Sequence, residues 1–228
     1  MMFRYTLLSS LLVGLSIPCG TLLATPISVP NFSFEDTDVA AGSISGSTPG
    51  WLRVGGGGTY ELVGVDFLSI APLPAPADGN QMAYFESGTA NPGTVILTSA
   101  ASLGTVSLGM TYTLTAAVGH RNFDAAGGRR PDDYMVELLV DGSPVASNTL
   151  LNAHTNIPSG EWANLSTSYS APAAGGELTI RLTHSSDDLT FRQGAFDNIR
   201  LDVVPEPTTF ALTALGMLAL SLRRGKTA

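Results

Sequence analysis

Hydrophobic and polar positions alternate with a period of two through the middle of the chain, and no helical periodicity interrupts them. Tyr112, Leu114, Ala116 and Val118 fall on one face of such a pattern, and the threonines between them fall on the other. The same criteria predict further strands at 27–35, 60–65, 82–86, 94–98, 134–140, 145–150, 165–169, 178–183 and 196–203. Asp141-Gly142 is typical of a hairpin turn. The pattern predicts an all-β fold, an antiparallel jelly-roll β-sandwich.

The N-terminal end has a different pattern. Arg4 precedes an apolar run at 7–17, and Leu22-Leu23-Ala24 offers a cleavage site. Residues 1–24 are therefore predicted to be a signal peptide.

The single cysteine, Cys19, lies inside this predicted signal peptide. Pro18 immediately before it argues against a lipoprotein signal. Residues 25–203 then form one domain without cysteine, so its stability must come from a hydrophobic core or a metal.

The C-terminal end, 204–228, combines a proline-rich motif, an uncharged apolar run at 208–222 and a basic terminus. As a helix this run would span about 22 Å, less than the ~30 Å hydrocarbon core of a bilayer. The arrangement resembles the PEP-CTERM sorting tail of exported bacterial proteins, which implies recognition by an exosortase at the inner membrane and delivery to the cell surface or extracellular matrix. A simple membrane anchor is the alternative. The residues of the expected sorting motif are Pro205, Glu206, Pro207, Arg223 and Arg224.

The charge of the predicted domain is strongly negative. It holds every acidic residue except Glu206 and every basic residue except Arg4, Arg223, Arg224 and Lys226, which leaves 18 acidic against 7 basic side chains. Such a surface repels phosphate backbones, so nucleic acid is excluded as a partner, and neutral glycans or cations are favoured.

Short motifs near both ends of the predicted domain resemble galactose-binding-like jelly rolls. Asn31-Phe32-Ser33-Phe34-Glu35 is similar to their opening, and Phe196-Asp197-Asn198-Ile199-Arg200-Leu201 is similar to their closing strand. Asp78-Gly79-Asn80-Gln81 and Thr111-Tyr112-Thr113-Leu114 fit intermediate landmarks. The resemblance implies a sandwich like that of carbohydrate-binding modules, a group that ranges from lectins to structural modules.

Two carboxylates at the matching positions, Glu35 and Asp197, are the candidate metal ligands. The resemblance implies that they hold a structural Ca²⁺ where the first and last strands meet. If Ile199 faces the core, a period of two puts Asp197 on the same inward side, where an unpaired carboxylate is costly. The alternative is that Asp197 caps a turn or pairs with Arg181 or Arg192.

Catalytic patterns in the sequence are incomplete. The histidines have no metal-ligand spacing: His120, His154 and His184. Ile44 stands where a nucleophile elbow requires serine. The pairs Asp132-Asp133 and Asp187-Asp188 join neighbours that point to opposite faces of a strand, so they are interpreted as solvated charges rather than glycosidase acids.

Sugar binding is the remaining chemistry that the sequence suggests. An exposed Trp51 or Trp162 would stack on a pyranose ring, whereas buried rings would belong to the core. The segment 119–131 is the best candidate for a recognition loop, with a solvated loop as the alternative. The candidate ligand-binding residues are Trp51, His120, Arg121 and Asn122.

The sequence thus predicts a non-enzymatic, exported surface protein that associates with exopolysaccharide or another matrix glycan. The expected partners are an exosortase, a glycan and the membrane through the tail. The alternatives are a secreted polysaccharide hydrolase and a structural surface protein without a ligand.

Overall fold

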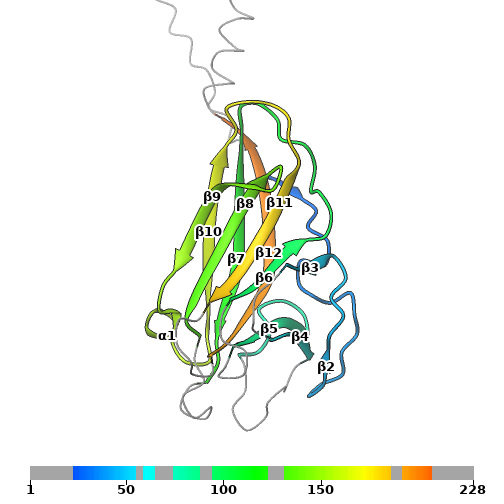
Figure 1. Cartoon of the computed structure of the whole chain (residues 1–228), viewed down its shortest axis with the longest axis vertical. Helices are drawn as coiled ribbons and strands as arrows, with labels where there is room; N and C mark the ends of the chain where they lie inside the picture. Colours follow the sequence, from blue (N-terminus) through cyan, green and yellow to red (C-terminus); the bar gives the residue numbers. More distant parts are fainter. Residues whose placement is uncertain are drawn as a thin grey trace, which may run out of the picture.

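A computed structural model describes residues 23–54, 59–64, 74–87, 94–122, 131–185 and 192–206 of the protein. Within these residues the chain forms twelve strands, which build two antiparallel sheets (Figure 1). The prediction of an all-β antiparallel sandwich is confirmed. No helix among the described residues is both long enough and apolar enough to cross a membrane.

Sheet A is the larger of the two sheets. Its strands are, in spatial order, β10 (Trp162–Ser170), β7 (Met110–His120), β12 (Arg192–Pro205), β5 (Gln81–Ser87), β4 (Thr59–Gly64) and β2 (Ile44–Ser45). The first part of β12 pairs with β5, and its later part pairs with β1 (Thr25–Ile27). The described chain therefore begins and ends side by side, as the closing strand of the predicted jelly roll requires.

Sheet B covers the inner face of sheet A. It contains β3 (Trp51–Arg53), β6 (Val95–Ser99), β11 (Leu178–Ser185), β8 (Asp133–Val140) and β9 (Ser143–Leu150). The predicted hairpin joins β8 to β9, with positive φ angles of 49° at Asp141 and 75° at Gly142. The short helix α1 (Ala153–Asn156) lies between β9 and β10 in the chain.

The hydrophobic core fills the space between the two sheets. The predicted inward residues of β7 belong to it, and Leu114, Ala116 and Val118 have no exposed surface. Sheet B contributes alternate residues of β8 and β11 to the same core. Among them are Val136, Leu138, Ile180 and Leu182. The period-two pattern therefore identified the buried faces of these strands correctly.

The first predicted strand, 27–35, is wrong beyond residue 27. The backbone turns after Pro30, Asn31 has a φ of 48°, and the Phe34 N–H donates to the Asn31 carbonyl at 3.1 Å. Phe34 is fully buried while Phe32 is 42% exposed, so the two rings do not share a strand face. The apparent alternation was produced by a turn that places one of the two rings in the core.

A β-bulge in β12 reverses the expected direction of Asp197. Between Asp197 and Arg200 the chain advances three residues, while β7 advances only two, from Ala117 to Thr115. Asn198 takes up the extra residue with a φ of 49°. As a result, Asp197 lies on the outer face of sheet A rather than on the inward side with Ile199. The prediction was wrong because a bulge inserts one extra residue, which shifts the alternation of side chains between the two faces of the strand.

Several predicted segments lie outside the described residues. These are the signal peptide core 7–17, the pair Asp187-Asp188, the apolar run 208–222, and the residues Pro207, Arg223 and Arg224. Pro205 is the last residue of β12, and the Glu206 N–H donates to the Gly109 carbonyl at 2.8 Å.

Candidate active site on the outer face of sheet A

Small side chains form a floor on one half of the outer face of sheet A. This half contains the part of β12 that precedes the bulge. Ala195 pairs with Gly119 of β7 on one side and with Tyr84 of β5 on the other. Asp197 pairs with Ala117 of β7. Ala117 and Ala195 are 3% and 0% exposed, so this floor is covered although it lies outside the sandwich core.

Larger side chains surround this floor. Val63, Met82, Tyr84 and Ala195 form a second hydrophobic cluster, and Trp162 packs against it. The ring of Trp162 lies over Gly119 so closely that a Cβ on this glycine would be 2.9 Å from Cζ3 of the ring. We call this area the Asp197 patch, which consists of Met82, Tyr84, Ala117, Gly119, Trp162, Ala195 and Asp197.

Asp197 is the acid of the patch and has no exposed surface. Desolvation by burial raises its pKa to about 7, although the backbone N–H groups of Asp78, Asn198 and Ala77 favour the charged form. Its Oδ2 accepts from the Asp78 N–H at 2.9 Å, and its Oδ1 accepts from the Asn198 N–H at 2.7 Å. A carboxyl with this pKa can both give and take a proton near neutral pH.

The segment from Pro74 to Asp78 covers the patch. Its Ala75 carbonyl accepts from the Trp162 indole N–H at 2.7 Å, and its end is held by the bond from the Asp78 N–H to Asp197. Pro74 is itself buried. The segment was predicted as an extended proline-rich loop, and tertiary contacts make it the outer wall of the site.

A chain of hydrogen bonds runs from the patch toward the end of β7. The Tyr84 hydroxyl donates to Glu86 Oε2 at 2.5 Å. The same carboxylate oxygen accepts from the Gln193 side-chain amide, whose carbonyl oxygen accepts from Arg121. Gln193 has no exposed surface and Arg121 is 4% exposed, so these bonds are shielded from water.

The predicted metal ligands Glu35 and Asp197 hold opposite ends of one turn. Glu35 Oε1 accepts from the N–H groups of Asn80 and Gln81 at 2.7 and 2.6 Å, whereas Asp197 binds the Asp78 N–H. A Cβ on Gly79 would be 2.5 Å from Glu35 Oε1, so only glycine allows this approach. The two carboxylates therefore bind donors from the same turn, at 78–81. No cluster of three metal-ligating side chains occurs in the described part of the chain.

The alternative cationic partners proposed for Asp197 have other acids. Arg181 forms a bidentate pair with Glu137, with distances of 2.5 and 2.7 Å. Arg192 lies 3.5 Å from Asp132. Asp197 instead binds backbone N–H groups, as the turn-capping alternative envisaged.

The predicted ligand-binding residues lie in several places. Trp51 is only 5% exposed, packs on Phe34 at 5.7 Å and donates to the Asn31 carbonyl, so its ring belongs to the core and is not a stacking platform. His120 is buried, and its Nδ1 lies 2.7 Å from the Ile157 carbonyl oxygen. Arg121 is linked to Tyr84 of the patch through Gln193 and Glu86, and the half-buried Asn122 follows it in the chain.

Five residues of the patch were not singled out from the sequence: Met82, Tyr84, Ala117, Gly119 and Ala195. Their signal is weak, because it consists of small residues at alternate positions of β7 and β12 beside an aromatic residue of β5. Such residues become a site only after the strands are paired.

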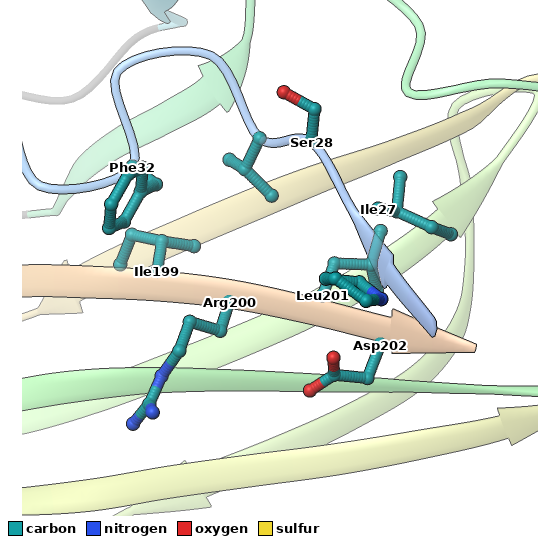
Figure 2. Close-up of a pocket in the computed structure, with 9 residues that line it drawn as sticks. Ile27, Ser28, Phe32, Ile199, Arg200, Leu201 and Asp202 are labelled. Carbon is teal, nitrogen blue, oxygen red and sulfur yellow. The ribbon is translucent and has the colours of Figure 1, made fainter. Parts of the chain in front are cut away.

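A separate groove of about 310 Å³ lies beyond the bulge, on the side of β12 that faces β1. Figure 2 shows Phe32 beside Ile199, with Arg200 and Asp202 directed to the other side of β12. The groove is lined by Pro26, Ile27, Ser28, Val29, Phe32, Ile199, Arg200, Leu201 and Asp202. It is apolar and distinct from the Asp197 patch.

Fold and patch together define a β-sandwich that shields an acid of near-neutral pKa against small side chains and two aromatic rings. Such a site suits proton transfer to a small, largely apolar molecule. A model of the HpiC1 cyclase family matches residues 25–202, and the chain belongs to this HpiC1-like family. No match occurs among curated proteins.

Solved cyclases from Fischerella have a similar fold. One from Fischerella sp. TAU is 23% identical, with a TM-score of 0.61 over 81% of this chain and 99% of its own. A Stig cyclase from the same source, in complex with (3Z)-3-(1-methyl-2-pyrrolidinylidene)-3H-indole, is 21% identical, with a TM-score of 0.62 over 81% and 100%. A third, in complex with 4-(1H-indol-3-yl)butan-2-one, is 20% identical, with a TM-score of 0.61 over 80% and 99%.

Family membership corrects the functional prediction. The expectation of a non-enzymatic surface protein with exopolysaccharide and exosortase as partners is wrong, because the matched family is one of cyclases. The prediction was wrong because the same sandwich architecture occurs in both binding modules and enzymes. Whether such a domain binds or catalyses depends on a few residues of one face.

Proposed function

We propose that the protein is a cyclase in which Asp197 donates a proton to a small, indole-bearing substrate and so starts ring closure. The observation that carries this proposal is the burial of Asp197, with a pKa of about 7, beside the floor of Ala117 and Ala195. The indole class is suggested by the ligands of the Fischerella structures.

The proposed reaction begins with proton transfer from the Asp197 carboxyl to a carbon of a nucleophilic π bond. The resulting cation is attacked by a second π bond of the same molecule, and a new carbon–carbon bond closes the ring. Loss of a proton to the Asp197 carboxylate then restores the acid, so no redox partner is consumed.

The neighbours of Asp197 support this chemistry. The rings of Trp162 and Tyr84 pack in the same cluster, and aromatic faces stabilise cationic charge. The segment from Pro74 to Asp78 excludes water that would otherwise capture the cation.

Exchange of the indole C3 hydrogen in D₂O tests the acid directly, because it requires proton transfer to carbon but no ring closure. The wild-type protein should accelerate the exchange, as followed by proton NMR. Asp197→Asn should lower the rate by about 10²-fold or more, a typical contribution of a general acid. Asp202→Asn, on β12 beyond the bulge, is the matched control and should exchange at the wild-type rate. Equal rates for Asp197→Asn and wild type would refute the assignment.

Calcium is proposed at Glu35 without Asp197. Glu35 Oε2 accepts one long bond, from the Gln81 side chain at 3.2 Å, and a carboxylate oxygen suits this hard cation. When bound, the ion would serve to stabilise the turn at 78–81. A cation against Asp197 would hold its carboxyl ionised, which is incompatible with the role of an acid.

Export to the cell envelope is also proposed, from the predicted signal peptide 1–24 and from the resemblance of 204–228 to a PEP-CTERM tail. The full chain should be found in the envelope or medium, and a chain that begins at Thr25 should stay in the cytoplasm. The same distribution of both chains upon fractionation would contradict this proposal.

A further inference from the structure

The segment from Pro74 to Asp78 lies over the Asp197 patch without belonging to either sheet. The residues of the patch itself stand on β5, β7, β10 and β12, whose backbones are paired with their neighbours. Among the described residues, 74–78 forms no backbone–backbone hydrogen bond with a strand. Pro74 and Pro76 give the local reason, because proline has no N–H to donate and its ring fixes φ. The segment is therefore stiff but independent of the strand ladders.

Two side chains of the patch hold this segment in place. The Trp162 indole N–H donates to the Ala75 carbonyl at 2.7 Å. The Asp197 carboxylate accepts from the Asp78 N–H at 2.9 Å and also from the Ala77 N–H. Ala75 and Ala77 are exposed to solvent, so their side chains bury little apolar surface. A few hydrogen bonds, rather than a large apolar contact, thus keep the segment on the sheet.

These contacts stand at opposite corners of one small area of the sheet. Gly119, which lies under the Trp162 ring, pairs with Ala195, and Ala117 pairs with Asp197. The segment crosses from the Gly119 corner to the Asp197 corner, and Asp197 has no exposed surface. A substrate reaches this acid only if some part of its cover moves. The paired strands would have to break their ladders to do so, whereas 74–78 would not.

The turn that follows the segment is fixed separately, by Glu35. Glu35 Oε1 accepts from the N–H groups of Asn80 and Gln81 at 2.7 and 2.6 Å. Gly79, at the start of this anchored part, has a φ of 72°. Glycine has the widest choice of backbone angles, and hinges are a few such positions at the end of an element. The geometry therefore allows 74–78 to move while the turn stays in place.

We propose that residues 74–78 form a lid that lifts about Gly79 to expose Asp197 to a substrate and then closes again. This inference rests on the proposed function, because it says how a small molecule reaches the buried acid. Lifting frees Oδ2 of Asp197 from the Asp78 N–H. Closing restores the cover that keeps water away from the cation.

Thiol labelling of the folded full chain measures this movement. The single cysteine, Cys19, is removed by Cys19→Ser, so that each introduced thiol is the only one. Ala117→Cys places a thiol on the covered floor, and Ala116→Cys, its neighbour in β7, places one in the core between the sheets. Both positions are buried, yet the floor thiol should react with iodoacetamide at least about tenfold faster, because a lid opens more often than the whole fold.

Urea below the unfolding transition distinguishes the two kinds of opening. The floor rate should hardly change, because lifting five residues exposes little surface, whereas the core rate should rise with urea. Melting curves establish that each variant is folded. If Ala117→Cys is unfolded, hydrogen exchange of the Trp162 indole N–H takes its place. It should be faster than that of Trp51 in the core and independent of urea.

Trp162→Phe tests the contact that holds the lid, because it removes the indole N–H and keeps an aromatic ring. It should speed labelling of Ala117→Cys about two- to tenfold, the effect of one lost hydrogen bond, and leave Ala116→Cys unchanged. The larger reagent DTNB should be accelerated equally, since a hole left by the smaller ring would favour iodoacetamide alone. Ser168→Ala, in the exposed part of β10, is the matched control and should keep the wild-type rate.

The outcomes separate the lid from the proposed function. Equal labelling of Ala117→Cys and Ala116→Cys, or the same dependence of both on urea, would overturn the lid while Asp197-dependent exchange at the indole carbon still stood. No acceleration by Trp162→Phe, or acceleration with iodoacetamide alone, would overturn the indole contact as its latch. Fast floor labelling together with wild-type exchange in Asp197→Asn would instead refute the acid and leave the movement of 74–78 established.

Discussion

The outer face of sheet A has two halves of opposite character, although β7, β10 and β12 run through both. Beyond the bulge, β7 and β10 present a ladder of hydroxyl groups that bond in pairs: Thr111 with Ser170 at 2.8 Å, Thr113 with Ser168 at 2.9 Å, and Thr115 with Ser166 at 3.1 Å. The serines are exposed to solvent. On the other side of the bulge the same strands present Ala117, Gly119 and Trp162, which are part of the covered Asp197 patch.

This difference shows how one face of a sheet can have a solvent-exposed half and a half that holds a buried acid. Polar pairs on an exposed face form hydrogen bonds with each other and with water, and each pair contributes about 0.2–1 kcal/mol to stability. Small residues leave room for a covering segment, and the covering segment desolvates Asp197. The bulge at Asn198 separates the exposed half from the covered half, because it determines which residues of β12 share the outer face with β7 before and after the bulge.

The largest expected effect on stability is the pH response of the covered half. The pKa of Asp197 is raised to about 7 in the folded chain, so the folded state binds its proton more tightly than the unfolded state. This contribution to stability is complete below about pH 4 and is lost as the pH rises through 7. It amounts to up to about 4 kcal/mol, at 1.36 kcal/mol per pKa unit.

Chemical denaturation of wild type and Asp197→Asn across this range, in the presence of a chelator, measures that response. The difference in unfolding free energy should move in favour of the variant as the pH rises from 4 to 8. Asp202→Asn, in the exposed half, should follow wild type, and a constant difference between wild type and Asp197→Asn would contradict the covered acid.

Calcium should stabilise the covered half next most strongly. If Ca²⁺ binds only the folded chain at Glu35, a hundredfold excess over its dissociation constant adds about 2.7 kcal/mol. Glu35→Gln should remove this rise in melting temperature, and Asp197→Asn should keep it. A melting temperature that ignores both calcium and chelator would rule out the ion.

The smallest expected effect is a difference in stability between substitutions at two positions of the same strand, β7. Gly119→Ala places a Cβ 2.9 Å from the Trp162 ring, so the ring must shift, and overpacking of this kind costs about 1–3 kcal/mol. Thr113→Ala in the exposed half loses one hydroxyl pair and should cost less than about 1 kcal/mol. Equal losses, measured by denaturant titration, would mean that the two halves do not differ in packing.

The amino-acid sequence by itself determined the fold class and most of the strands in the second half of the domain. In β7, β8 and β11 the alternation of apolar residues with threonines and charges specifies which face is buried, because successive side chains of a strand point to opposite sides. Asp141-Gly142 specified its hairpin in the same local way, since both residues tolerate a positive φ. These features depend on neighbours in the chain.

The tertiary structure alone decided where Asp197 lies and what surrounds it. The bulge at Asn198 moved its carboxyl from the expected core side to the outer face, and a segment far away in sequence, from Pro74 to Asp78, then covered it. Tyr84, Ala195 and Gly119 come from three different strands and form one site only through strand pairing. Local periodicity contains no information about such pairing, and the pKa of Asp197 depends on burial that only the complete fold produces.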